Sequence, residues 1–419
     1  MFNVQNSRVW LPGDPGFDAA RRPWNLAVEQ PVAAVVEAGD AGDVAAVVRS
    51  ARAAGLGVTA QPNGHGATGR TDDGVVLLRT GRLDSLVVDP SARRARVGAG
   101  VPSGRLQAAA AAHGLTGLPG SSPVVSVTGV VLGGGVSWFG RAHGWVADSV
   151  TAFDVVDAAG EHRHVTDGDL FWALRGGGGD FAMVTGLELA LHPAPRLYGG
   201  RVLWAAEHAP EVVDAFRRIT ADAPRELTVW LDLLHFPGAA PMVAVDTTYL
   251  GGSAEARDLL ASLDRLPRPL SDSRRVMRVS ELGGITAEPT DPSPGLSRAE
   301  LLTEFTDTTA KALLADPIAP LMSVQVRHLG GAFTRASDSP HGPLTEPYLV
   351  YLFGAPGDDV ALRQRDLAGA LPVSGRKPFT FLNPTETAAD AFTPEVLARL
   401  RDIKRHHDPA GVFRGNFPI

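Results

Sequence analysis

A stretch of small residues at positions 120–150 constrains this chain most. It reads GSSPVVSVTGVVLGGGVSWFGRAHGWVADSV, and it holds Gly129 and a glycine triplet at 133–135, with no charged residue before Arg141. Glycine loses more backbone freedom on folding than any other residue, so this density is costly inside regular structure. We therefore expect backbone here to lie against a flat or phosphorylated group, with the rest of the chain arranged around it.

Composition narrows the class of protein. A length of 419 residues suits two domains, and 44% hydrophobic with 20% charged residues is a globular balance. The net charge is −7 and no basic run occurs, so nucleic acid is not an expected partner. There is no cysteine, which excludes disulfides and thiolate catalysis. Without Cys, HxxH or HExxH, no metal site is predicted either.

The chain shows no sign of a membrane or export signal. The first sixteen residues lack a basic segment followed by an apolar one, so no signal peptide is expected. No window approaches the roughly 18 consecutive apolar residues of a membrane helix. We therefore expect a cytoplasmic protein, with the choice between monomer and homodimer left open.

The front half alternates short strands and helices. An apolar strand at 31–37, a helix starting at an Asp43 N-cap and ending near Gly55, and a strand at 57–61 predict a βαβ unit with a parallel strand pair. Ser103 is expected to cap a helix at 104–112. Further strands are predicted at 75–78, 86–88, 95–97, 150–157 and 183–191.

The second half changes character at about residue 198. Longer alternating segments predict an antiparallel sheet with one covered face. Its strands are expected at 201–205, 227–233, 243–249, 323–327 and 348–353, and helices at 253–263, 298–314, 358–370 and 394–406. The Pro-, Ser- and Asp-rich segment 266–297 is either a lid or a plain loop.

Two further features bear on chemistry. His65 lies between Gly64 and Gly66, just after a buried strand, and it is either a loop histidine bonded to backbone or a residue that a cofactor approaches closely. The four glycines at 176–179 indicate a tight crossover or a close backbone approach. The glycines of 120–150 do not match the GxGxxG dinucleotide fingerprint, which excludes a Rossmann site, although glycine-rich turns also cradle pyrophosphate.

Four motifs together resemble one family. They are PNGHGATGR at 62–70, the 120–150 stretch with its R-x-HG-x-x-x-D ending, DLFWALRGGGGDF-x-x-VT at 169–185, and IKRHHDPAGVFRGN at 403–416. In this order they are similar to the berberine-bridge-enzyme-like branch of the vanillyl-alcohol-oxidase family of FAD oxidoreductases.

The resemblance covers most of the chain and implies an α+β fold. It implies a PCMH-type FAD-binding domain of two subdomains at 1–195 and a substrate domain at 196–384, whose large antiparallel sheet is covered by helices. A C-terminal segment at 385–419 would return to the FAD domain.

The resemblance also implies a cofactor site. FAD would be joined covalently to His65 through the flavin 8α-methyl carbon, because neutral imidazole is a competent nucleophile. Some members add a second bond from a cysteine; Ser122 stands there, so the attachment can be single at most. His143 and Phe181 are expected to pack near the flavin. The other implied cofactor-binding residues are Pro62, Asn63, Gly64, Gly66, Gly69, Gly120, Ser121, Ser122, Val125, Ser126, Gly129, Gly133, Gly135, Val136, Val184 and Asn416.

The chain departs from the family near residue 381. Many members carry Tyr-x-Asn-Tyr, whose tyrosine deprotonates the substrate, whereas this chain has Phe381, Asn383 and Pro384. A phenyl ring cannot accept a proton. Strand alternation puts Ser323, Gln325 and Arg327 on one face and His328 on the other. The candidates chosen for catalysis are Asn383, Tyr351, Gln325 and Arg327; Asp232, His235, Tyr249 and Tyr348 are alternatives that structural roles explain as well.

Three functions remain open at this point. The first is an FAD-dependent oxidoreductase in which substrate hydride passes to flavin N5 and O₂ becomes H₂O₂, acting on a small alcohol or a specialised-metabolite intermediate. The second is a flavin-containing enzyme that catalyses a redox-neutral isomerisation or cyclisation, suggested by the missing tyrosine. The third is a binding protein without flavin.

Overall fold

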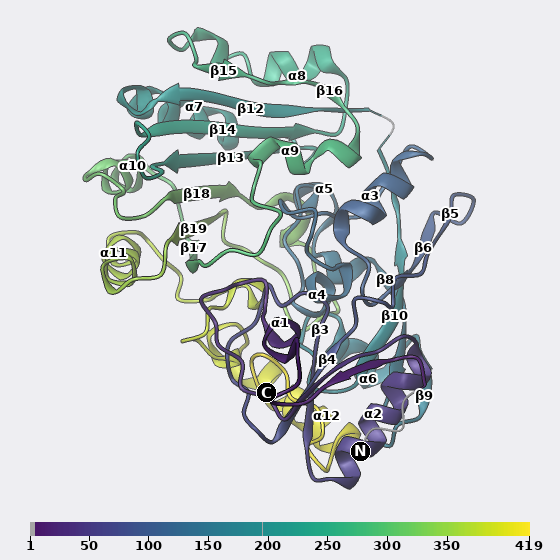
Figure 1. Ribbon diagram of the computed structural model, residues 1–419. Coiled ribbons are helices and arrows are strands. Elements are labelled where there is room, and N and C mark those ends of the chain that lie inside the picture. Colours follow the sequence, from purple (N-terminus) through teal and green to yellow (C-terminus); the bar gives the residue numbers. More distant parts are fainter. Residues whose placement is uncertain (1–4, 195) are drawn as a thin grey trace.

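The computed structural model describes residues 5–194 and 196–419 (Figure 1). Residues 1–4, part of the segment used to predict the absence of a signal peptide, lie outside this range. The described strands form sheets of four, five, two and eight strands. The first half carries the helices α1 (Phe17–Arg21), α2 (Ala41–Ala53), α3 (Ser103–Ala111), α4 (Val127–Leu132), α5 (Gly140–His143) and α6 (Gly168–Leu174). The second half carries α7 (Ala209–Ala221), α8 (Ser253–Leu259), α9 (Gly283–Thr286), α10 (Asp307–Leu314), α11 (Asp358–Gly369) and α12 (Pro394–His407).

The four-stranded sheet begins the chain, in the order β1-β2-β4-β3. β2 and β3 run parallel as predicted, but each pairs with β4, which lies between them. Helix α2 buries its Val44, Val47 and Val48 face against this sheet. Its N-cap is Asp40, whose side chain accepts a bond from the Asp43 amide at 2.9 Å, so the prediction of Asp43 as the cap was wrong. The strands are β1 (Arg8–Trp10), β2 (Ala34–Glu37), β3 (Gly57–Gln61) and β4 (Val75–Arg79).

The five-stranded sheet is antiparallel, in the order β5-β6-β10-β8-β9. Helix α3 follows it and begins at Ser103 with Pro102 as N-cap and no side-chain cap, so the predicted capping role of Ser103 was wrong. The strands are β5 (Leu86–Asp89), β6 (Arg94–Gly98), β8 (Val150–Val156), β9 (His162–Val165) and β10 (Met183–Ala190). A separate pair is formed by β7 (Leu115–Thr116) and β11 (His192–Pro193).

The eight-stranded sheet occupies the upper part of Figure 1 and is also antiparallel. Side chains of α7, α8, α10 and α11 pack against one face of it. Its other face, called the inner face below, is turned toward the first half of the chain. The strands are β12 (Leu197–Ala205), β13 (Leu227–Leu234), β14 (Met242–Tyr249), β15 (Ser271–Asp272), β16 (Arg275–Met277), β17 (Leu296–Leu302), β18 (Ser323–His328) and β19 (Tyr348–Gly354).

One helix prediction in this half was wrong. The segment expected to be helical from 298 to 314 is a strand, β17, followed by the shorter helix α10. β17 pairs with β19 along its whole length, from Leu296 opposite Gly354 to Leu302 opposite Tyr348. Pairing with a neighbouring strand thus overrode the local helical preference of this segment.

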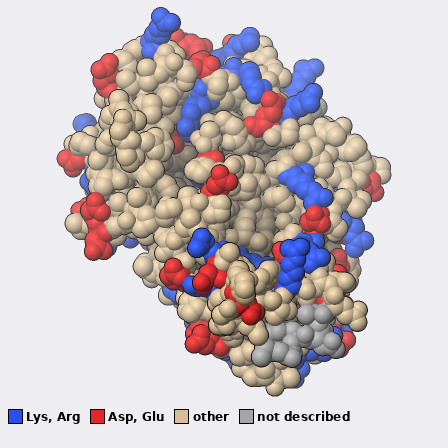
Figure 2. Space-filling model, viewed as in Figure 1, with Lys and Arg blue, Asp and Glu red and all other residues tan. Residues whose placement is uncertain are grey.

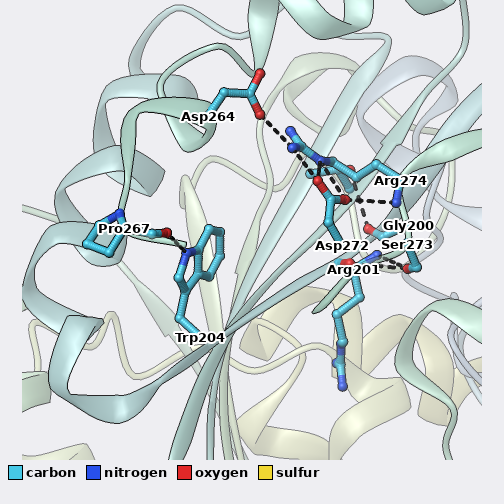
Figure 3. Close-up of polar contacts among 9 residues, drawn as sticks. Gly200, Arg201, Trp204, Asp264, Pro267, Asp272, Ser273 and Arg274 are labelled. Atoms are coloured by element: carbon cyan, nitrogen blue, oxygen red, sulfur yellow. Dashed lines mark hydrogen bonds and ion pairs between the residues drawn. The ribbon is translucent and has the colours of Figure 1, made fainter. Parts of the chain in front are cut away.

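The first part of segment 266–297 is held against the sheet edge (Figure 3). Arg274 makes 2.6 Å ion pairs with both Asp264 and Asp272, and Trp204 donates its indole N–H to the Pro267 carbonyl at 2.9 Å. β15 and β16 pair with β12. In Figure 3 the side chain of Arg201 extends away from this cluster, toward the inner face.

The chain end returns to the first sheet. Val58 of β3 donates to the Val412 carbonyl at 2.7 Å, and Arg414 donates back to Val58 at 2.9 Å. Phe413 is buried with the core of α2. Residues far apart in sequence therefore meet around β3 and the loop that follows it. Within the two described ranges, no helix combines the length and apolar character needed to cross a membrane.

Candidate functional site

The loop at 62–70 joins four distant parts of the chain. Asn63 donates from Nδ2 to the Val124 carbonyl at 2.7 Å, and its own carbonyl accepts from the Trp24 amide at 2.8 Å. Thr68 Oγ1 donates to the Asn416 carbonyl at 3.0 Å, and the Arg70 guanidinium donates to the Glu386 carbonyl at 2.7 Å. These bonds bring the predicted cofactor-binding residues of the loop, the glycine stretch and the C-terminus into one place.

His65 is held in this loop without a polar partner. Its ring stacks on Trp24 with centroids 4.0 Å apart and planes 18° apart. Both ring nitrogens are buried, and neither has a hydrogen-bond partner among the described residues. Burial lowers the pKa of His65 to about 4, so the imidazole is neutral near neutral pH and keeps a nucleophilic lone pair. Buried polar atoms are rarely left unpaired, so this ring is arranged to meet another group.

The glycines near this loop fall into two kinds. A Cβ added to Gly66 would make an ordinary van der Waals contact with Asn416 at 3.6 Å, and one added to Gly120 would make such a contact with Val136 at 3.9 Å. The triplet differs: a Cβ on Gly133 would lie 3.0 Å from Thr380, one on Gly134 would overlap His341 Nε2, and one on Gly135 would lie 2.6 Å from a Val130 methyl. The triplet is therefore explained by protein packing, whereas protein packing does not require glycine at Gly66 or Gly120.

The segment after Gly120 is fixed by backbone pairing. Ser103 donates to the Val125 carbonyl at 2.8 Å. Ser126 is the N-cap of α4 and accepts from the Gly129 amide at 3.1 Å, which accounts for a serine at this position. The Ser122 hydroxyl is buried without a partner in the described chain. Val184 adjoins a β-bulge between itself and Gly186, a distortion common beside active sites.

The R-x-HG ending of the glycine stretch binds it to the large sheet. Arg141 is buried and donates to carbonyls at the start of β13, including that of Leu227 at 2.8 Å. His143 stacks on His192 with ring centroids 4.0 Å apart. Trp138 stacks on Trp230 of β13 at 3.5 Å and 14°. The stacking of Trp138 on Trp230 therefore packs the glycine stretch against the inner face of the large sheet.

Strand register gathers polar side chains on that inner face. Trp230 lies opposite both Asp246 and Arg327, and Asp246 lies opposite Arg201. The adjacent row holds Asp232, Gln325 and Tyr351 in neighbouring strands. Tyr249 and Tyr348 belong to the opposite, helix-covered core, and His328 contacts Arg141. The predicted alternation along β18 therefore agrees with the observed contacts.

An ionic group occupies one end of these rows. Arg201 bonds to Asp246 through two nitrogens at 2.6 and 2.7 Å and to Asp232 at 3.3 Å. Ser323 donates to the other oxygen of Asp232 at 2.6 Å. Burial raises the pKa of Asp232 to about 7. The signal that singles it out is an acid within a strand, LTVWLDLL, that is buried at every position.

Arg327 occupies the other end. Its Nε donates to Gln325 Oε1 at 2.6 Å, and its guanidinium lies 4.2 Å from the centre of the Trp230 ring. The rings of Phe381 and Tyr351 lie 5.3 and 5.7 Å away. These two rings also pack against the cluster that contains Val136 of the glycine stretch. The glycine stretch and the inner face of the large sheet therefore meet at this cage. Figure 2 shows a hollow near the centre of the displayed surface, with mostly uncharged walls.

Asn383 forms a tight turn beside the cage. Its side-chain oxygen accepts from the Thr385 amide at 2.9 Å and from the Thr385 hydroxyl at 2.7 Å. Its backbone amide donates to Glu386 at 2.9 Å. The side-chain amide oxygen of Asn383 is thus already hydrogen-bonded within the turn. The catalytic role of Asn383 stays a prediction.

The sequence comparisons identify the family. The family described as FAD binding domain matches residues 32–166. (R)-6-hydroxynicotine oxidase of Paenarthrobacter nicotinovorans is 31% identical over 445 aligned residues, which cover 98% of this chain and 96% of that protein. The chain belongs to the berberine-bridge-enzyme-like family of FAD-linked oxidoreductases. It is therefore an FAD-linked enzyme, as the four motifs predicted.

Solved structures agree with this family. The crystal structure of 6-hydroxy-D-nicotine oxidase from Arthrobacter nicotinovorans matches 100% of this chain and 99% of its own, with a TM-score of 0.86 and 27% identity. The berberine-bridge-enzyme-like protein 1 of Physcomitrella patens matches 99% and 96%, with a TM-score of 0.87 and 18% identity, which shows the fold alone. The predicted α+β fold class, with its large helix-covered antiparallel sheet, is confirmed.

The residues present fit an FAD. Both ring nitrogens of His65 are buried without a hydrogen-bond partner in the described chain, and the buried Ser122 hydroxyl also has none there. Gly66 and Gly120 are glycines that protein packing does not require. All four lie on segments that the loop at 62–70 brings together. An elongated cofactor placed here would satisfy polar atoms that the protein leaves unpaired.

Proposed function

We propose that this enzyme is an oxidase that carries FAD on a single covalent bond from His65 and oxidises a small organic molecule. The observation that carries the proposal is the neutral, unpartnered imidazole on the loop that joins the cofactor segments. The substrate would be an alcohol or an intermediate of specialised metabolism. Full-length similarity to an enzyme named as an oxidase supports an oxidase.

When bound, FAD supplies the hydride acceptor at N5 and the route to O₂, with H₂O₂ as product. The protein supplies position, charge and proton transfer. Loop 62–70 and the Ser122 and Asn416 segments hold the cofactor, with Val184 beside it. The inner face of the large sheet holds the substrate, because its polar row ends at the cage that contacts Val136.

Asp232 takes the role of proton acceptor that Phe381 cannot fill. A carboxyl group with a pKa of about 7 exchanges a proton readily at neutral pH. The Ser323 hydroxyl donates to Asp232 at 2.6 Å. A substrate proton taken up by this hydroxyl can therefore pass directly to the carboxylate, as the hydroxyl gives up its own proton. Arg201 holds the carboxylate in place. Gln325 and Tyr351 continue the row from Asp232 and orient the substrate.

Anaerobic mixing tests the redox reaction. Purified yellow enzyme is combined with primary alcohols, polyols, phenolic alcohols and secondary amines while the flavin absorbance is followed. We expect bleaching with at least one class, and stoichiometric H₂O₂ when air is admitted. A flavin that no class reduces would contradict the oxidase. A product of unchanged mass, formed without O₂ uptake, would instead establish the redox-neutral alternative that Phe381 suggests.

Denaturing electrophoresis tests the covalent bond. Flavin fluorescence should migrate with the unmodified chain and vanish in His65→Ala. His113→Ala is the matched control, because His113 is exposed and distant from the loop in sequence. Release of the yellow cofactor on acid precipitation of the unmodified protein would show that His65 forms no bond.

A further inference from the structure

Arg327 is a buried cation without a direct counter-ion. Its side chain is 5% exposed. Within the described residues its hydrogen bonding is limited to the bond from Nε to Gln325, and no described carboxylate pairs with it. Asp232 and Asp246, on neighbouring strands, are both engaged by Arg201. The guanidinium therefore keeps most of its five donors unused.

These unused donors are not sealed off by protein. A buried charge that lacks a partner costs several kcal/mol, so a chain keeps one only where another group meets it. Although Arg327 is buried as a residue, none of its atoms belongs to the fully enclosed polar atoms that lack a partner. Its terminal nitrogens are therefore not fully enclosed, and they lie on the inner face of the sheet, in the same row as Trp230. Two parallel N–H groups match the geometry of a carboxylate.

The surrounding rings favour a flat substrate. Trp230 supports the guanidinium from one side, and Trp138 stacks behind Trp230. Phe381 and Tyr351 stand on the open side with ring centroids 5.7 Å apart. Phe381 presents a plain apolar surface. Aromatic walls of this kind hold a conjugated ring by offset or edge contacts.

We propose that Arg327 binds the carboxylate of a substrate acid whose conjugated ring packs against Phe381 and Tyr351. The inference rests on the proposed function, because it names the substrate class of that same site. It makes Arg327 a specificity residue that touches the substrate, while proton transfer stays with Asp232.

Glu288 tunes the affinity of this site. It belongs to the segment at 266–297, is half-buried, and its charge acts on Arg327, Tyr351 and Arg201 without a hydrogen bond or ion pair in the described chain. Burial lowers the pKa of Arg327 and the charge of Glu288 partly opposes that effect. A carboxylate ligand at Arg327 is repelled by Glu288. Removing this charge should therefore strengthen anion binding.

Ligand binding tests the inference without turnover. Benzoate and cinnamate, with benzamide and cinnamamide as neutral isosteres, are titrated into flavin-loaded enzyme by calorimetry and by the shift of the flavin spectrum. We expect the acids to bind more tightly than the amides. Arg327→Gln should weaken the acids by about 30-fold or more and leave the amides within a few-fold, since a buried charge pair loses a partner. Arg275→Gln, at an exposed arginine of β16, is the control.

Two further variants keep the test decisive if Arg327→Gln misfolds. Arg327→Lys should retain the preference for acids with weaker binding, and Glu288→Gln should tighten the acids alone. Equal affinity for acids and amides, or looser acid binding in Glu288→Gln, would overturn the inference. If a neutral substrate reduces the flavin while neither benzoate nor cinnamate binds, the inference is refuted and the proposed oxidation stands. If the acids bind tightly but no substrate bleaches the flavin, the proposed oxidation is refuted and the inference about Arg327 stands.

Discussion

Replacing Asp232 by asparagine should change the pH dependence of both stability and flavin reduction. In the folded protein burial raises the pKa of this carboxyl from 3.8 to about 7. The fold therefore holds the proton more tightly than the unfolded chain does. The resulting stabilisation is fully present below the unfolded pKa and is lost as the pH rises through about 7.

The structure sets the size of this effect. One pKa unit corresponds to about 1.4 kcal/mol, so a shift of roughly three units has a ceiling of about 4 kcal/mol. Part of the titration falls below pH 5, so between about pH 5 and pH 8 the wild-type protein should lose about 2–3 kcal/mol through this group. Asparagine does not titrate. The stability of Asp232→Asn relative to wild type should therefore improve by the same amount over that range.

Urea unfolding at several pH values measures this difference, because titrations shared by both proteins cancel. Stopped-flow bleaching of the flavin should show a rate that rises through about pH 7 in the wild type. The variant should lose that inflection and react about 100-fold more slowly or worse. Asp214→Asn, at an acid on α7 that is 59% exposed, should leave both profiles unchanged. Parallel stability curves and an unchanged rate inflection in Asp232→Asn would refute the reasoning.

Three further substitutions test the architecture of the cofactor side. Gly134→Ala should lower the free energy of unfolding by about 3 kcal/mol or more, because the new Cβ would overlap His341 and because Gly134 has a φ of 89°. The control Gly252→Ala places its Cβ in open space and should leave the melting temperature unchanged. Equal melting temperatures in the two variants would contradict this. Ser126→Ala should cost about 1 kcal/mol in urea unfolding through the lost α4 cap, and a neutral result would exclude that role. Asn63→Ala should cost about 1 kcal/mol and lower the ratio of flavin to protein, since the bond to Val124 is lost; full flavin content would separate this bond from cofactor retention.

The sequence alone predicted the family and the segments expected to bind FAD. Glycine density and four ordered motifs identified the family, because the backbone of these segments must satisfy close approaches that few residue types allow. Periodicity located α2, α11, α12 and most strands, since one buried face imposes its spacing on the chain. The lack of cysteine excluded any covalent bond from a cysteine to the flavin. The departure at Phe381 was also visible, and it directed attention to the inner face of the large sheet.

Tertiary structure decided what lies next to what. β17 looked helical because pairing with β19 lies outside any local pattern. The glycine triplet packs on His341 and Val146, contacts that no sequence spacing reveals. Arg201, Asp232 and Arg327 become neighbours only through cross-strand register. Register sets which side chains share one row, and burial then shifts their pKa values, so the tertiary fold rather than any single motif decides the site that we propose for the substrate.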